Sequence, residues 1–536
     1  MSYVLALSFH PAFFPPKSGG EERLYNIYNN LSRHFKVKLI TFTYPNSNNS
    51  VETVDHNENF TEIRIPKTKI SAAVHHFINR CSDIKECSAV VTSIESRFNK
   101  NFKKVFQDEI DSADAVIFVY PFLYTVPDRF LKDKKVIYES HNIEYELMKE
   151  SFSGSVLGKI LLEYVFYLEK SLSKKSSFIF AVSEENKARF SSLYPVDQNK
   201  IYISPNGVNP DIYNGFFEKK ALINNSKICA FIGSYHPPNI EAVENISQFA
   251  SKMPEILFLI AGNVSQYFIN SNLIEKSTLD LHSIFNSQKV SLINGFYGVE
   301  YWDTIPTVWC KPEFTIRISE IIDSIELKVY SPKENELKAK TRNRLFSFKL
   351  DEGWNSIKIE GLIENNYDIL FESKSNFESD KRNLSIALQE INYYINNEAV
   401  RFDFDRDMNQ SFALKNTKNV VLLGRISDEE KQALYRTADV ALNPMTSGSG
   451  TNIKMLDYMA AGLPVISTPV GARGLGLKSY ENAIICEIPE FPEKIKQIFS
   501  DSELHAKISL NGRRAIEEKF DWRTIASEMV KVLEEK

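Results

Sequence analysis

Residues 443–468 combine a glycine-rich turn with a lysine and a carboxylate at helical spacing. The Gly-Ser-Gly stretch at 448–450 keeps bulky side chains away, so backbone N–H groups of the turn can face a ligand. Lys454 follows within about one turn, and Asp457 lies three residues later on the same face of a helix. Amides, a cation and a carboxylate together suit a nucleoside diphosphate, with its phosphates at the amides and lysine and its ribose hydroxyls at the carboxylate.

This turn needs a strand before it and a helix after it. The apolar run Val440–Leu442 is typical of a buried parallel strand. A helix is predicted from about Thr451 to Gly462, and the next strand from Leu463 to Ser467. The N-terminus of such a helix favours an anion. A glycine-rich turn can also serve packing alone, and this one is neither a P-loop nor a G-x-G-x-x-G fingerprint.

Other candidate residues also stand at predicted strand and helix ends. His141 follows a predicted strand at 136–139 and is expected to face a cleft, although a structural loop histidine is the alternative. Gly19 and Gly20 precede a helix, where their amides can meet a leaving phosphate or an acceptor. A structural turn is again the alternative there. Asn206 lies at a predicted domain junction, where it either contacts a ligand or only forms a turn.

Several of these segments resemble motifs of glycosyltransferase family 4, the group 1 family of retaining sugar-nucleotide transferases. The resemblance runs in the family's order over about 400 residues. It rests on Gly19-Gly20-Glu21-Glu22-Arg23, Glu139-Ser140-His141-Asn142-Ile143-Glu144, Ser183-Glu184, Ser204-Pro205-Asn206-Gly207-Val208, Gly233 with Pro238-Asn239, Ala261-Gly262, Leu423-Gly424 and residues 443–468.

The resemblance implies a GT-B fold, with two Rossmann-like doubly wound α/β domains facing a cleft. It implies that His141 contacts the donor sugar or assists the acceptor, and that Gly19 and Gly20 form the acceptor or phosphate loop. The donor-binding residues that it implies are Gly233, Ser449, Gly450, Thr451, Asn452, Lys454 and Asp457. Among these, Lys454 and Asp457 are expected, with His141, to take part in catalysis.

The sequence departs from the family pattern at two places. Ser449 stands where the family usually has the first of two glutamates, which leaves the donor sugar undetermined. The loop after Gly233 lacks the Arg and Lys that many members use for the diphosphate. Lys454 is expected to supply that charge, with Arg425 or Arg473 as helpers.

No metal or cofactor is expected. Asp403, Asp405 and Asp407 form an Asp-x-Asp pattern like the metal sites of the other major glycosyltransferase fold. They follow a strand-rich segment rather than an early nucleotide-binding strand, so the metal interpretation is disfavoured. The five cysteines show neither a disulfide framework nor metal-ligand spacing.

The composition is typical of a globular protein with several domains. The 536 residues are too many for one core, and 43% are hydrophobic and 25% charged. A net charge of −5 gives no reason to expect a nucleic-acid partner. The N-terminus has no basic region or cleavage site, and no apolar run is long enough to cross a membrane. We expect a cytoplasmic protein, with peripheral association at the inner face of the membrane left open.

Periodicity divides the chain into three regions. Residues 1–205 form the predicted acceptor-side Rossmann-like domain, and the family resemblance implies that helix 521–536 packs back on it. Residues 206–295 and 411–520 form the donor-binding domain. Between them, residues 296–410 alternate apolar and polar residues over several short strands, which predicts an inserted β-sandwich. It resembles a module inserted in some bacterial polysaccharide-assembly transferases.

The favoured function is a retaining, metal-independent glycosyltransferase. It moves a sugar from a nucleotide-diphosphate sugar to a hydroxyl of a polysaccharide, oligosaccharide or glycolipid acceptor. Three alternatives stay open: a sugar-phosphate synthase or phosphorylase on the same fold, a non-catalytic carbohydrate-binding protein, and a GT-B epimerase. The replacement of the glutamate by Ser449 makes the second plausible. The sequence specifies neither the nucleotide base, the acceptor, the linkage nor the oligomeric state.

Overall fold

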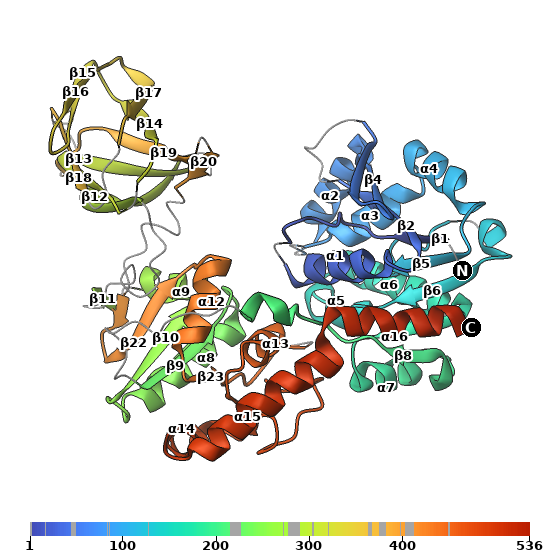
Figure 1. The fold of residues 1–536 in the computed structure, drawn as a ribbon. Helices are drawn as coiled ribbons and strands as arrows, with labels where there is room; N and C mark the ends of the chain where they lie inside the picture. The colour runs from blue at the N-terminus through green and yellow to red at the C-terminus, as the bar shows by residue number, and fades with distance from the viewer. Residues whose placement is uncertain are drawn as a thin grey trace. The chain divides into compact units, whose positions relative to one another are not determined.

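A computed structural model describes most of the chain, and its contacts divide it into two compact units (Figure 1). The described residues are 3–16, 18–43, 50–82, 84, 86–126, 128–214, 227–271, 273–276, 290–302, 305–319, 321–362, 367–374, 382–396, 398–402, 412–448 and 451–535. The first unit comprises Met1–Asn214, Met445–Glu487 and Ser500–Lys536, and the second comprises Gly215–Pro444 and Ile488–Phe499. This division groups 445–487 with the N-terminal sheet, whereas the sequence-based boundaries, which stay a prediction, assign it to the second domain.

The first unit contains a sheet with the strand order β3-β4-β2-β1-β5-β6-β7-β8. Its strands are β1 Tyr3–Leu7, β2 Lys36–Phe42, β3 Glu52–Asn57, β4 Phe60–Ile65, β5 Ala115–Val119, β6 Lys135–Glu139, β7 Phe178–Ala181 and β8 Ile201–Ile203. All neighbours pair in parallel except β3 and β4. The central strands β1 and β5 are buried along their whole length, as expected for a sheet covered on both faces. The predicted doubly wound α/β fold is confirmed here.

Several helices of this unit begin at side-chain caps. Ser18 accepts a hydrogen bond from the Glu21 amide at 3.4 Å, and Ser183 accepts one from the Asn186 amide at 3.2 Å. The helices are α1 Gly19–Leu31, α2 Lys69–Cys81, α3 Ser88–Ser96, α4 Lys100–Ile110, α5 Glu144–Phe152, α6 Val156–Lys175, α7 Glu184–Leu193, α13 Ile453–Ala460, α15 Ser502–Ala515 and α16 Trp522–Glu535. Helices α3, α5 and α13 do not begin at such caps.

The C-terminal helix shares a core with the N-terminal sheet. Trp522 and Met529 of α16 are buried in the same cluster as Leu24 and Ile27 of α1. The short strands β24 Val465–Ser467 and β25 Ile484–Ile485, which form a parallel pair, also belong to the first unit.

The second unit contains an α/β part with the strand order β11-β21-β22-β10-β9-β23. Its strands are β9 Lys227–Ile232, β10 Ile256–Ala261, β11 Ile274–Lys276, β21 Phe412–Leu414, β22 Thr417–Gly424 and β23 Val440–Asn443. Strands β22, β10, β9 and β23 pair in parallel, whereas β11 and β21 are antiparallel. Its helices are α8 Pro237–Ala250, α9 Ser265–Asn270, α12 Asp428–Thr437 and α14 Phe491–Ser500.

An antiparallel β module lies between β11 and β21 in the chain. Its strands are β12 Val290–Trp302, β13 Ile305–Ile318, β14 Ser324–Ser331, β15 Asn335–Lys340, β16 Leu345–Leu350, β17 Gly353–Glu360, β18 Tyr367–Ser373, β19 Ala387–Ile395 and β20 Glu398–Arg401. One long strand, β13, pairs with β19 through residues 308–309 and with β18 through residues 313–318. The strands therefore form one connected path around a core of their own, and the two-sheet sandwich stays a prediction.

The module starts earlier than its sequence pattern indicates. Strand β12 begins at Val290, whereas the predicted boundary is at 296. Register shifts interrupt β12 between Leu292 and Val299, and Gly295 adopts a φ of +82°. These irregularities break the strict alternation that a sequence pattern needs. Asp403, Asp405 and Asp407 lie outside the described residues.

None of the helices that the structure describes combines the length and apolar character needed to cross a membrane.

Candidate active site

The two helix starts predicted at glycine-rich loops lie against each other in the first unit. Helix α1 begins at Gly19, and α13 begins at Ile453 after Asn452. A Cβ atom added to Gly19 would lie 2.5 Å from Cδ1 of Ile453. Only a glycine at position 19 therefore allows this approach without a shift of the isoleucine side chain. Two predicted sites, the acceptor or phosphate loop and the donor loop, meet at this contact.

The loop before α13 is held by polar contacts to the segment after β24. Thr468 Oγ1 donates a hydrogen bond to the Met445 carbonyl, and Arg473 Nη2 donates to the Gly448 carbonyl at 2.9 Å. Asn452 Nδ2 donates to the Gly471 carbonyl at 3.2 Å. Arg473, expected to assist at the diphosphate, thus supports the loop. The predicted donor residues Ser449 and Gly450 lie outside the described residues.

Thr451 lies near a second glycine segment and near the end of β7. A Cβ atom added to Gly474 would lie 3.1 Å from Thr451 Oγ1 and 3.6 Å from Ser183 Cβ. Gly474 has a φ of +78°, a conformation that L side chains rarely adopt. The predicted donor residue Thr451 and the Ser183 motif therefore pack around one glycine.

Lys454 and Asp457 lie on the first turns of α13, as their spacing predicts. Loss of hydration lowers the pKa of the Lys454 ammonium to about 7, and its Nζ lies 4.0 Å from Met445 Sδ. Asp457 Oδ1 accepts a hydrogen bond of 2.9 Å from the Tyr213 hydroxyl. A bound anion would favour the charged form of Lys454, whereas one oxygen of Asp457 is already held by Tyr213.

His141 is buried, and both of its ring nitrogens have partners inside the protein. Its Nδ1 lies 2.6 Å from the Tyr120 hydroxyl oxygen, and its Nε2 lies 3.2 Å from Glu139 Oε1. Burial lowers the pKa of His141 to about 4 despite the neighbouring Glu139 carboxylate, so the imidazole is neutral near pH 7. As placed, both ring nitrogens are engaged by Tyr120 and Glu139 within the protein.

The Glu139 carboxylate is buried and strongly stabilised. Burial alone would raise its pKa, but the hydrogen bond from His141 and the charge of Arg23 hold that pKa at about 2. Arg23 Nε donates to Glu139 Oε1 at 3.1 Å, and the Tyr28 hydroxyl donates to Oε2 at 2.7 Å. The carboxylate therefore stays ionised and accepts the His141 Nε2 proton.

Arg23 connects this network to the predicted junction. Its Nη1 lies 2.7 Å from the Pro205 carbonyl oxygen and 3.4 Å from Asn206 Oδ1. Its Nη2 donates to Ser204 Oγ at 3.1 Å. Asn206 is thus joined to His141 through Arg23 and Glu139. Asn206 therefore lies beside Arg23, the residue that pairs with Glu139.

Gly20 and Gly233 lie in separate units. A Cβ atom on Gly20 would lie 3.4 Å from the Tyr120 hydroxyl. In the second unit, Gly233 follows β9, and a Cβ atom there would lie 3.0 Å from Asn239 Cβ. The Asn239 amide donates to the Ser234 carbonyl at 3.0 Å, which fixes the start of α8. Gly233 therefore leaves little room for a side chain, whereas a Cβ atom at position 20 would make ordinary van der Waals contacts.

Sequence reasoning missed Tyr120 and Tyr213 as site residues. Tyr120 has a φ of 70°, unusual for a residue with a side chain, and directly follows β5. Its place after a predicted strand was the one available signal. Arg23 and Glu139 stood inside quoted motifs but received no role. Their mutual contact joins residues far apart in the chain.

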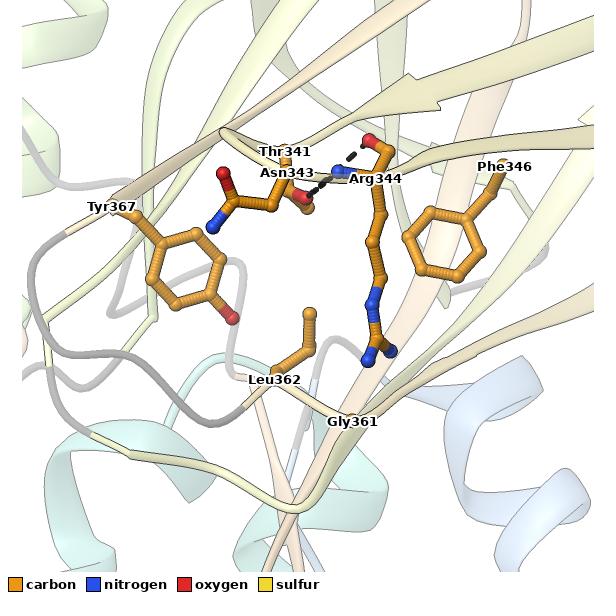
Figure 2. Close-up of a pocket in the computed structure, with 7 residues that line it drawn as sticks. All are labelled: Thr341, Asn343, Arg344, Phe346, Gly361, Leu362 and Tyr367. Atoms are coloured by element: carbon orange, nitrogen blue, oxygen red, sulfur yellow. Dashed lines mark hydrogen bonds between the residues drawn. The ribbon is translucent and has the colours of Figure 1, made fainter.

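A separate cavity of about 210 Å³ lies in the β module (Figure 2). Figure 2 shows the Arg344 side chain crossing it, with the guanidinium beside Gly361, where a Cβ atom would lie 2.7 Å from Nη1. The cavity is lined by Thr341, Asn343, Arg344, Phe346, Gly361, Leu362 and Tyr367. None of the residues predicted to bind donor or acceptor lines it.

Comparisons with known proteins show which family model and which relatives this chain resembles. Residues 377–501, which include the loop before α13, match the family model described as Glycosyl transferases group 1. The chain is 32% identical over 117 residues to an uncharacterized glycosyltransferase of Methanocaldococcus jannaschii, covering 21% of this chain and 30% of that protein. It aligns with about a third of the length of the curated relatives that it matches (32%, 30% and 32%).

Solved structures resemble the chain over its full length. A sucrose-phosphate synthase from Thermosynechococcus elongatus has a TM-score of 0.54 at 12% identity, covering 100% of this chain and 99% of that chain. An Anabaena protein in complex with UDP and glucose has a TM-score of 0.52 at 10% identity, covering 100% of each chain. The predicted GT-B fold class is confirmed.

Proposed function

We propose that this chain is a retaining, metal-independent sugar transferase, because residues 377–501 match the family model described as Glycosyl transferases group 1. The donor is a nucleotide-diphosphate sugar. The acceptor is a hydroxyl group of a polysaccharide, oligosaccharide or glycolipid in a bacterial-type assembly pathway. The UDP complex of the similar Anabaena protein supports the nucleotide part of this proposal.

One observation carries the proposal: the Gly19 start of α1 and the Ile453 start of α13 lie together, with Lys454 next in the chain. Each helix N-terminus presents backbone N–H groups and the positive end of its dipole, and the contact of Gly19 with Ile453 brings the two N-termini together. Such a region suits the two phosphates of a nucleoside diphosphate better than it suits a neutral sugar.

The same groups account for catalysis. When the bond between the sugar and the diphosphate breaks, negative charge accumulates on the leaving diphosphate. Fixed amides and the Lys454 ammonium stabilise that charge more strongly in the transition state than in the ground state. Since the protein supplies the positive charge, we propose that the reaction needs no metal ion.

The proposal is tested with purified protein and UDP-, GDP-, ADP- and TDP-sugars in the presence of EDTA. We expect release of the nucleoside diphosphate from at least one donor and a product whose anomeric configuration matches that of the donor. Failure to bind or cleave every donor would contradict the transferase assignment. An inverted product would contradict retention, and activity lost in EDTA but restored by magnesium or manganese would contradict metal independence.

A further inference from the structure

The strongest unassigned feature lies where the first sheet reverses its strand order. Strand β1 lies between β2 and β5, so the chain leaves it on one side toward β2 and returns on the other at β5. In open α/β sheets, ligands bind outside the carboxyl ends of the strands at such a point. His10 follows β1 there, and Tyr120 follows β5. Neither residue was among the predicted site residues.

His10, Tyr120 and His141 form a short row of polar contacts. The Tyr120 hydroxyl oxygen lies 2.6 Å from His141 Nδ1 and 3.4 Å from His10 Nε2. On its other side, His10 Nδ1 lies 3.1 Å from the Pro11 carbonyl oxygen. The row ends at Glu139, which lies 3.2 Å from His141 Nε2.

The protons along this row can be assigned from the partners. Glu139 is an ionised carboxylate, so His141 Nε2 carries a proton and Nδ1 carries a lone pair. The contact of 2.6 Å then requires the single Tyr120 proton to point at His141 Nδ1. The Pro11 carbonyl can only accept, so His10 Nδ1 donates to it and His10 Nε2 carries a lone pair.

In this assignment the lone pair of His10 Nε2 faces the Tyr120 hydroxyl oxygen, whose one proton already points at His141. Within the part of the chain that the structure describes, His10 Nε2 has only the long contact of 3.4 Å to Tyr120. A donor from outside the protein, such as an O–H group, would complete it. Burial lowers the pKa of His10, and the charge of Lys67 lowers it further. The charges of Glu21 and Glu62 oppose this effect but do not cancel it, so the ring is neutral near pH 7.

Residue 20 adds no side chain beside His10 Nε2. A Cβ atom on Gly20 would lie 4.0 Å from Nε2 and 3.4 Å from the Tyr120 oxygen, and a glycine leaves that position unfilled. The Phe9 ring packs edge-on against the rings of His10 and Tyr120, with ring centroids 4.9 Å apart in each pair. Tyr120 keeps a φ of 70°, a strained conformation of the kind found at functional sites.

We propose that His10 is an acceptor-binding residue, whose Nε2 accepts the hydrogen bond of the hydroxyl group that receives the sugar. Tyr120 and His141 are positioning residues that hold the row in one protonation pattern. The inference rests on the proposed transferase function and adds a named contact on the acceptor side. The chemical class recognised is an alcohol hydroxyl.

The first test separates use of the acceptor from use of the donor. The probes are octyl glucoside, octyl galactoside and octyl mannoside as acceptors, and calorimetric titration with the nucleoside diphosphate. His10→Phe keeps a ring but removes the lone pair, so we expect the KM for the preferred octyl glycoside to rise by about tenfold or more. Affinity for the nucleoside diphosphate, measured without an acceptor, should stay within about twofold.

Two further variants serve as a second measurement and as a control. His10→Gln keeps a side-chain acceptor, so it should lose less than His10→Phe and supplies the measurement if the phenylalanine variant fails to fold. His34→Phe changes an exposed histidine of the same unit and should behave as the wild type. Wild-type transfer rates in His10→Phe, or equal losses of nucleotide affinity and transfer, would overturn the assignment of His10.

The second test examines the proton assignment without any turnover. Nitrogen-15 NMR of histidine-labelled protein should show His10 as the neutral Nδ1–H tautomer and His141 as the neutral Nε2–H tautomer. A protonated Nε2 on His10 would overturn the inference whichever acceptor is used. A wild type that neither hydrolyses nor transfers any donor would overturn the proposed function itself.

Discussion

The Lys454 ammonium lies in a buried environment that disfavours its positive charge. Its pKa of about 7 arises from lost hydration, so an approaching diphosphate would supply the interaction that water no longer gives. At the same scale, burial also keeps His141 neutral, and its two ring nitrogens contact Tyr120 and Glu139. In the proposed mechanism a bound diphosphate would favour the charged form of Lys454, whereas His141 stays neutral and organises its neighbours.

Replacing Lys454 with Ala should weaken binding of nucleoside diphosphate by about ten- to hundredfold, because a charge-assisted contact contributes roughly 1.5–3 kcal/mol. Turnover should fall further, since charge develops on the leaving group. Calorimetric titration with UDP and GDP measures the effect. Lys478→Ala, which removes an exposed lysine paired with Glu481, is the matched control. Wild-type affinity in Lys454→Ala would show that the donor site is elsewhere.

The pKa of Lys454 also gives this contact a pH dependence. Below about pH 7 the free protein already carries the ammonium, whereas above it a proton must be taken up as the diphosphate binds. Affinity should therefore fall as the pH rises from about 7 to about 9, and Lys454→Arg, which stays charged, should flatten the profile.

Replacing His141 with Ala should reduce sugar transfer far more than it reduces affinity for free nucleoside diphosphate. The change deprives Tyr120 and Glu139 of a partner but leaves Arg23 and Tyr28 on the carboxylate. His56→Ala is a matched control, since His56 is also buried and hydrogen-bonded to a buried glutamate, at 3.0 Å. Equal and large losses in affinity and rate would instead place His141 on the nucleotide.

At the element scale, the approach of α1 to α13 depends on the absence of one side chain. The atom that a Cβ at position 19 would meet is Cδ1 of Ile453, the far end of a flexible side chain. A larger residue at this position can therefore be accommodated by a shift. That shift would displace the two helix starts, which are the elements proposed to bind the diphosphate.

Gly19→Ala should therefore lower turnover while the melting temperature stays near the wild-type value, because alanine suits the first turn of a helix. Adding Ile453→Val shortens the opposing side chain and should recover part of the lost rate. Gly154→Ala, where an added Cβ meets nothing within 4 Å, is the control. Unchanged kinetics in Gly19→Ala would show that this contact is incidental to catalysis.

At the scale of the whole molecule, the β module is attached to its unit through one antiparallel strand pair. Lys276 at the end of β11 is the register partner of Phe412 at the start of β21. The module between them has its own core, in which Phe314 and Phe371 stack with ring centroids 4.7 Å apart. Its role in recruiting the acceptor is our hypothesis.

Replacing residues 277–411 with Asn-Gly should leave a folded protein, because this dipeptide closes a two-residue hairpin between paired strands. Nucleotide binding and donor hydrolysis should persist, whereas transfer to a long acceptor should fall. A cut at 297 would instead divide β12, which begins at Val290. A soluble, folded deletion variant that cannot bind nucleotide would show that the module helps to build the donor site.

The sequence by itself determined the fold class, the loop before α13 and the glycines at the start of α1. These features are local, since a turn that exposes amides and a helix that follows it are encoded by neighbouring residues. It also indicated an all-β insertion from a change of period, but placed its start too late, because bulges in β12 interrupt the alternation.

Only the tertiary structure decided which residues of the candidate site meet. The contact of Gly19 with Ile453, and the row from His10 through Tyr120 and His141 to Glu139, join residues from distant parts of the chain. The positive φ of Tyr120 and the proton pattern of both histidines depend on those contacts. A sequence pattern reports spacing along the chain, whereas hydrogen-bond partners and lost hydration depend on which strand ends become neighbours in the sheet.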